Sequence, residues 1–213
     1  MQQTPANYAD YLEYDRRQRG IERHVLTAFL GGLAVGGLVT ALPGPLSAVY
    51  DPYAVLGLAV AVGATASGIP WALLTAFLAG ASSIVTSMAV GAIQGHPGFE
   101  LVGDDARGLN LLLLQLVIVG LLANLARRAG AWGDAAAGLV GAVLLGDVID
   151  RATPGLVAYE RGFWPWPALV VGVLTAAGVI LLRRRHGMGV LRALAVTAAL
   201  AGSFALLVLL VLR

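Results

Sequence analysis

Seven apolar runs follow one another along the chain, separated by short segments that hold most of its prolines and charged residues. The runs cover 25–42, 54–69, 71–93, 109–126, 135–149, 166–182 and 190–212. An α-helix needs about 20 apolar residues to cross a bilayer, so the longer runs predict membrane-spanning helices. The runs 54–69 and 135–149 are short and would need a thinned bilayer or flanking residues to complete a crossing. The pattern predicts an all-α polytopic transmembrane bundle of seven spans, or of six if 54–69 is re-entrant or interfacial.

Proline and tryptophan mark the edges of these runs. Prolines lie between the runs or at their ends, at Pro43, Pro45, Pro52, Pro70, Pro97, Pro154, Pro165 and Pro167. Helices tend to stop at such positions. The four tryptophans also lie at predicted helix ends, where side chains that favour the membrane interface are expected. Both patterns support the predicted boundaries.

Composition points to lipid as the solvent. Hydrophobic residues make up 58% of the chain and charged residues only 12%, whereas soluble domains carry about 25% charged residues. All 14 basic residues are arginine, so no lysine is present to form a Schiff base with retinal or pyridoxal phosphate. The chain also lacks cysteine, which excludes disulfides, thiolate nucleophiles and cysteine-ligated iron–sulfur clusters.

The arginines predict the orientation. With a cytoplasmic N-terminus and seven crossings, the cytoplasmic side holds Arg16, Arg17, Arg19, Arg23, Arg127, Arg128, Arg183, Arg184, Arg185 and Arg192. The outer side holds only Arg107, Arg151, Arg161 and Arg213. This distribution obeys the positive-inside rule, and removing one span would reverse every later loop. Because all-arginine usage is typical of GC-rich bacterial genomes, we expect a multi-pass protein of a bacterial inner membrane.

The N-terminal segment differs from the rest of the chain. We expect residues 1–23 to form a cytoplasmic amphipathic segment ahead of a transmembrane bundle at 24–213. A short helix is predicted at 5–19, ended by Gly20. Its tyrosines recur every three residues, at Tyr8, Tyr11 and Tyr14. The segment is interpreted as a solvated helix at the membrane surface, with a partner-docking helix as the alternative.

Small residues recur every fourth position in several runs. The first run carries Ala28, Gly32, Gly36 and Thr40, and the third carries Ala72, Ala76 and Gly80. Membrane helices associate by close backbone contact at such residues, so these stripes predict a tightly packed bundle. Such faces are also surfaces for a protein partner or for a second copy of the chain.

Two groups of polar residues are candidates for a solute path. Ser82, Ser83, Thr86 and Ser87 lie near the middle of the third run, and Asp147 and Asp150 lie at the end of the fifth. The hydroxyls would line a polar path or, alternatively, bond to their own helix or a neighbour. The two aspartates are one helical turn apart and would hold a cation or pair with Arg151 at the membrane boundary.

A predicted outer loop supplies a weaker candidate. His96, Glu100, Asp104 and Asp105 offer oxygen and nitrogen ligands for a cation. Their spacing matches no metal signature, which favours a solvated acidic loop. No metal site is therefore predicted there.

The chain is poorly supplied with catalytic groups. The three histidines lie at span ends or in loops, and the acids near a span interior share one helix, which disfavours both serine–histidine and paired-aspartate chemistry. We expect no enzymatic activity, no cofactor and no nucleic-acid partner. We find no motif specific to a known family. The favoured hypothesis is a transport-related or permease-like component for a small solute, and the alternative is a structural or accessory subunit that docks a partner protein.

Overall fold

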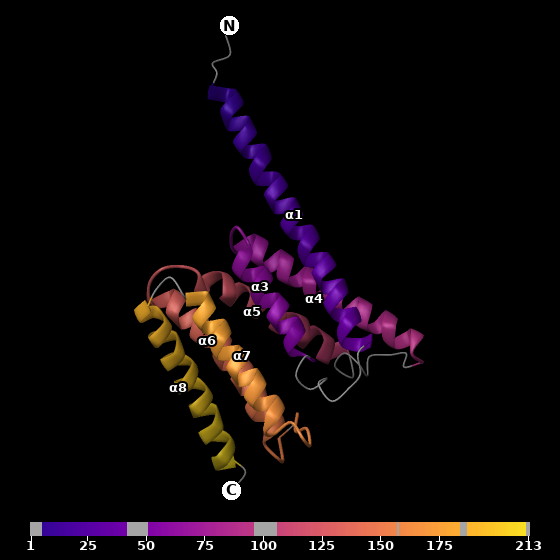
Figure 1. Cartoon of the computed structure of the whole chain (residues 1–213), viewed down its shortest axis with the longest axis vertical. Coiled ribbons are helices and arrows are strands. Elements are labelled where there is room, and N and C mark those ends of the chain that lie inside the picture. Colours follow the sequence, from indigo (N-terminus) through magenta and orange to yellow (C-terminus); the bar gives the residue numbers. More distant parts are fainter. Residues whose placement is uncertain (1–5, 42–50, 96–105, 157, 184–186, 212–213) are drawn as a thin grey trace.

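A computed structural model describes residues 6–41, 51–95, 106–156, 158–183 and 187–211. The helices are α1 (Ala6–Ala41), α3 (Tyr53–Thr65), α4 (Ile69–Ile93), α5 (Ala106–Ala126), α6 (Ala131–Ala152), α7 (Trp166–Arg183) and α8 (Gly187–Val211). The described residues contain no strand, which confirms an all-α helical bundle (Figure 1). Six of these helices are long and apolar enough to cross a membrane, and α3 is shorter. The chain is therefore a multi-pass membrane protein.

The short helix α3 nevertheless connects the two ends of the bundle. Its first residue, Tyr53, contacts Asp147 near the end of α6, and its last turn contacts Asn124 at the end of α5. We call the level of Asn124, where Arg127, Arg128, Arg183 and Arg192 also lie, the arginine-rich end. The opposite level is the Tyr53 end. Consecutive helices alternate in direction between these two ends.

Side chains from α5 and the residue after it cap the C-terminal end of α3. With 13 residues and about 1.5 Å of rise per residue, α3 is about 20 Å long, which is less than the roughly 30 Å of bilayer hydrocarbon. The Asn124 amide donates to the carbonyls of Gly63 and Ala66 at 3.1 Å each, and Arg127 donates to the carbonyl of Ala64 at 2.5 Å. The Gly63 carbonyl also accepts from the Ala66 N–H at 3.3 Å. The side-chain donors add partners for the carbonyls at the helix end, which matters most where water is scarce.

The small-residue stripe of α1 packs against α4. A Cβ atom on Gly32 would lie 2.0 Å from the Ser82 hydroxyl, and one on Gly36 would lie 2.1 Å from the Ser83 carbonyl. Only glycine permits this approach, so the stripe sets the contact between the two helices. The sequence LTAFL occurs at 26–30 in α1 and again at 74–78 in α4, and the two helices are parallel. Gly80, which follows the second copy as Gly32 follows the first, faces Leu116 of α5 instead.

Helix α1 is continuous, so the predicted helix end at Gly20 is wrong. Figure 1 shows α1 projecting well beyond the other helices. Helix-stabilising pairs four residues apart cover this stretch: Glu13 with Arg17 at 2.6 Å, Asp15 with Arg19 at 2.7 Å, and Gln18 with Glu22 at 3.1 Å. A single glycine costs a helix only about 1 kcal/mol, and the last pair bridges it directly.

A buried ion pair joins three helices at the arginine-rich end. Arg183, at the end of α7, pairs with Asp134 in the first turn of α6, and their side chains are 1% and 5% exposed. Arg183 also donates to the carbonyls of Ala126 at 2.9 Å and Arg128 at 2.7 Å. Arg192 of α8 approaches the second carboxylate oxygen of Asp134 at 3.7 Å. The sequence had indicated only that Arg183 belongs to a cytoplasmic arginine cluster.

Candidate functional site

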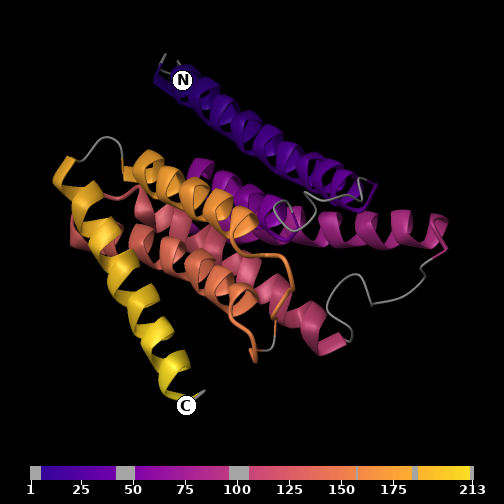
Figure 2. The same cartoon turned by 60° about the horizontal axis from the view of Figure 1, so that its bottom comes forward.

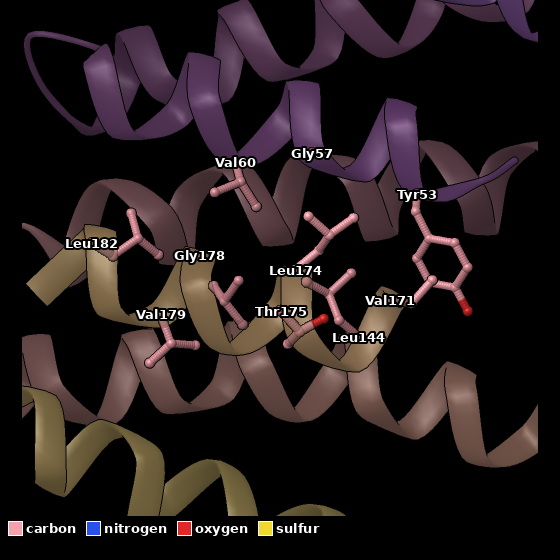
Figure 3. A pocket seen from close by; sticks show the side chains of 11 residues that line it. Tyr53, Gly57, Val60, Leu144, Val171, Leu174, Thr175, Gly178, Val179 and Leu182 are labelled. Carbon is pink, nitrogen blue, oxygen red and sulfur yellow. The ribbon is translucent and has the colours of Figure 1, made fainter. Parts of the chain in front are cut away.

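A crevice of about 270 Å³ lies between α3, α6 and α7. Helix α3 lies inside the bundle (Figure 2), and Figure 3 shows the side chains that line the crevice. The lining is Tyr53, Gly57 and Val60 of α3, Val140 and Leu144 of α6, and Val171, Leu174, Thr175, Gly178, Val179 and Leu182 of α7. Apart from the tyrosine and the threonine, every one of these side chains is apolar. We call this space the α3–α6–α7 crevice.

Two glycines keep the crevice open. A Cβ atom built on Gly57 of α3 or on Gly178 of α7 would have no heavy atom within 4 Å. These glycines therefore do not mediate a close helix contact, in contrast to Gly32 and Gly36. Their missing side chains leave room for a bound molecule.

Tyr53 closes one end of the crevice and begins a polar cluster. Its hydroxyl donates to the Asp147 carboxylate at 2.5 Å, which joins α3 to α6. Arg151 binds the same carboxylate oxygen at 3.1 Å and Glu160, in the α6–α7 connection, at 3.2 Å. The Arg151 guanidinium also lies 5.8 Å from the Tyr53 ring centroid and 6.0 Å from that of Phe163. We call these five residues the Tyr53 cluster.

The Tyr53 cluster is partly hydrated and rich in acids. The side chains of Arg151 and Asp147 are 22% and 24% exposed, which is consistent with a position near the water boundary. Asp51, just before α3, lies close to Arg151 and Glu160. Desolvation raises the pKa of the Asp51 carboxyl; Arg151 counteracts this, and Glu160 adds to it. Within the described ranges, no three acidic or histidine side chains come together to hold a metal ion.

The structure separates the residues predicted to line one solute path. Asp147 joins the Tyr53 cluster, and Asp150 lies half-buried one turn further along α6. Ser82 donates to the carbonyls of Phe29 and Ala79, and Ser87 donates to that of Gly36.

The other two hydroxyl residues of that group also lie on α4, away from the crevice. Thr86 donates to the carbonyl of Ser82 at 2.9 Å, and Ser83 is buried. The described hydroxyl contacts therefore match the alternative that was given for this group, bonding within and between helices. A solute path along α4 stays a prediction. His96, Glu100, Asp104 and Asp105 lie outside the described residues.

Sequence reasoning missed Tyr53, Glu160 and Thr175. Tyr53 lies 94 positions from Asp147, so no local pattern connects them. Thr175 did carry a signal, since it is the one hydroxyl residue in the run 166–182. Its position in the lining required the relative placement of α3, α6 and α7.

A second hollow, of about 940 Å³, lies between the projecting part of α1 and the start of α4. It is lined by Tyr14, Arg17, Gln18, Ile21, Glu22, Val25, Leu26, Phe29, Trp71, Leu74 and Leu78. The arginine, the glutamine and the glutamate are already paired within α1. This hollow therefore offers mainly an apolar surface.

The chain matches no protein-family model, no curated protein and no solved structure.

Proposed function

We propose that this membrane protein is a non-enzymatic, transport-related or permease-like component of a bacterial inner membrane. In this proposal a small solute occupies the α3–α6–α7 crevice. The observation that carries it is a hollow between three helices of a membrane bundle, held open by two glycines.

The Tyr53 cluster supports the proposal because it closes the crevice with bonds that can be exchanged. The Tyr53–Asp147 hydrogen bond and the Arg151–Glu160 ion pair cross from one element to another, while their side chains remain partly exposed to water. Water can replace such partners at modest cost. The crevice can therefore open at this end without unfolding of the bundle.

No catalytic step belongs to this proposal. Within the described lining, the hydroxyls are those of Tyr53 and Thr175, and Tyr53 already donates to Asp147. Thr175 has no histidine or carboxylate in the lining to take its proton. The crevice is suited to binding.

Native mass spectrometry after mild detergent extraction tests the proposal. We expect the wild-type protein to retain a small molecule and Gly178→Leu to lose it, because the new side chain fills the crevice. Gly172→Leu is the matched control: it lies on the same helix, has no heavy atom within 4 Å of a built Cβ, and does not line the crevice. Equal retention by all three proteins, or no retention by the wild type, would contradict the proposal.

A second candidate function is a structural or accessory subunit that docks a partner protein. The observation that favours it is the projection of α1 beyond the bundle (Figure 1), with Tyr11, Leu12 and Tyr14 exposed. Exposed aromatic side chains on a rigid helix are common anchors at protein interfaces. The same surface would serve a second copy of the chain.

Co-purification separates the two candidate functions. An accessory subunit should carry a stoichiometric protein partner through mild extraction, and Tyr11→Ser/Tyr14→Ser should release it. Arg16→Ser is the control, since it removes an exposed side chain from the same stretch of α1. A partner that survives the tyrosine substitutions would exclude docking through this face.

A further inference from the structure

The hydroxyl of Thr175 differs from those of the other helical threonines. Each of those threonines donates to the carbonyl four residues earlier in its own helix: Thr27, Thr40, Thr65, Thr75, Thr86 and Thr197. Thr175 is 5% exposed, yet within the described part of the chain its hydroxyl has no hydrogen-bond partner. Its oxygen is not fully enclosed by protein atoms, and Thr175 lines the crevice. The hydroxyl is therefore available to bond to a ligand there.

Polarity is distributed unevenly along the crevice. Tyr53 lies at one end and Thr175 near the middle, and the lining continues past Thr175 with Gly178, Val179 and Leu182 (Figure 3). The Tyr53 hydroxyl is occupied by Asp147, so Tyr53 presents its ring to the crevice. One hydrogen-bonding position is therefore followed by about two helical turns of apolar wall.

The crevice is accessible from the side that faces hydrocarbon. Leu174 lines it and is also 59% exposed, so the opening reaches the outer surface of the bundle among apolar side chains of α7. A molecule dissolved in the bilayer can reach the crevice without crossing the Tyr53 cluster. A charged group would lose its hydration there and find no counter-ion in the lining, so charged ligands are disfavoured.

We propose that the α3–α6–α7 crevice takes a neutral amphipathic molecule of the single-chain alcohol class, which arrives from the bilayer. The ligand's hydroxyl exchanges a hydrogen bond with Thr175, and its hydrocarbon chain lies along Val179 and Leu182 toward the arginine-rich end. This inference rests on the proposed function and names the chemical class of its solute. The volume of about 270 Å³ equals roughly nine water molecules at about 30 Å³ each, which suits a short chain and excludes a whole phospholipid.

Photolabelling with two matched probes tests the inference. The probes are an octan-1-ol and an octane that each carry a diazirine on the chain, applied to the full-length protein in detergent. Mass spectrometry locates the labelled residues and gives the half-saturating concentration of each probe. We expect octanol to label the crevice lining, and we expect Thr175→Val to raise its half-saturating concentration roughly two- to tenfold, the effect of one neutral hydrogen bond. The half-saturating concentration of octane should be the same for wild type and Thr175→Val.

Three further variants complete the design. Thr175→Ser keeps a hydroxyl and should restore octanol labelling. Thr75→Val is the matched control, because Thr75 is buried on α4, bonds to its own helix and does not line the crevice. Gly178→Leu should abolish crevice labelling by both probes.

The outcomes separate the two proposals. Equal half-saturating concentrations of octanol for wild type and Thr175→Val, with labelling still lost in Gly178→Leu, would overturn the proposal that the ligand is an alcohol. The crevice would remain a binding site. Lining residues labelled equally in wild type and Gly178→Leu would overturn the proposed function as well. A loss of octanol labelling in Thr75→Val matching that in Thr175→Val would also overturn the role of Thr175.

Discussion

Both ends of the bundle contain an arginine–aspartate pair, and the two pairs differ in their surroundings. At the arginine-rich end, Arg183 and Asp134 are almost completely buried, and Arg183 also donates to two backbone carbonyls. At the Tyr53 end, Arg151 and Asp147 lie four residues apart on one helix and are about a quarter exposed. The same two side-chain types therefore make a closed contact at one end and an open one at the other.

This difference indicates which end of the bundle is rigid and which end can rearrange. A buried pair cannot exchange its partners for water, so breaking it leaves an uncompensated charge in a poorly solvating site. A partly exposed pair contributes little to stability because water screens it and competes for its partners. The arginine-rich end thus holds the ends of α5, α6 and α7 together. At the Tyr53 end, the contacts next to the crevice can be exchanged for water at a small cost in free energy.

The largest effect is expected from removing one member of the buried pair. Arg183→Met should destabilise the folded bundle by about 3–5 kcal/mol, because Asp134 is left as a buried charge whose remaining ion pair among the described residues is the one with Arg192 at 3.7 Å. Arg183→Met/Asp134→Leu should recover most of that loss. Unfolding in mixed detergent micelles, followed by circular dichroism, measures both. A stability of Arg183→Met within about 0.5 kcal/mol of wild type would show that the pair does not fasten this end.

An intermediate effect is expected where α3 ends. Asn124→Leu should cost about 1–3 kcal/mol, since the Ala66 carbonyl loses its side-chain donor in a buried position and the Gly63 carbonyl keeps only the Ala66 N–H. Gln115→Leu is the control on the same helix; within the described residues Gln115 makes no side-chain hydrogen bond with a neighbouring helix. The same unfolding assay compares them. Equal stabilities for the two variants would mean that α3 does not depend on this cap.

The smallest effect is expected at the Tyr53 end. Tyr53→Phe removes the hydrogen bond to Asp147 and keeps the ring, so we expect a stability loss of about 1 kcal/mol or less. Native hydrogen exchange in the first turn of α3 should rise even though global stability hardly changes. A loss as large as that of Arg183→Met would remove the distinction between the two ends.

The sequence predicted the helices well because their signals are local. Apolar length and the positions of proline and tryptophan identified the long spans, and the small-residue spacing identified the face of α1 that contacts α4. The prediction that the helix ends at Gly20 failed because it gave more weight to the helix propensity of one glycine than to the side-chain pairs around it. Those pairs, such as Gln18 with Glu22, are also local and can be read from the sequence.

The candidate site was only partly predictable. Asp147 and Arg151 are four residues apart, so their pairing could be anticipated from helical geometry. Tyr53 meets Asp147 across 94 positions and Arg183 meets Asp134 across 49, and such contacts depend on how the helices pack. Hydrophobic runs define which segments are helices but leave the neighbours of each helix undetermined.

Labelling of single introduced cysteines in intact cells tests the membrane arrangement most directly, because the chain has no cysteine of its own. Tyr11→Cys, Ala129→Cys and Arg161→Cys place exposed thiols on α1, between α5 and α6, and between α6 and α7. If α3 completes a crossing and the N-terminus is cytoplasmic, a membrane-impermeant maleimide should label only position 161 until the cells are opened. Labelling of position 129 but not 11 from outside would contradict the alternation of the seven helices.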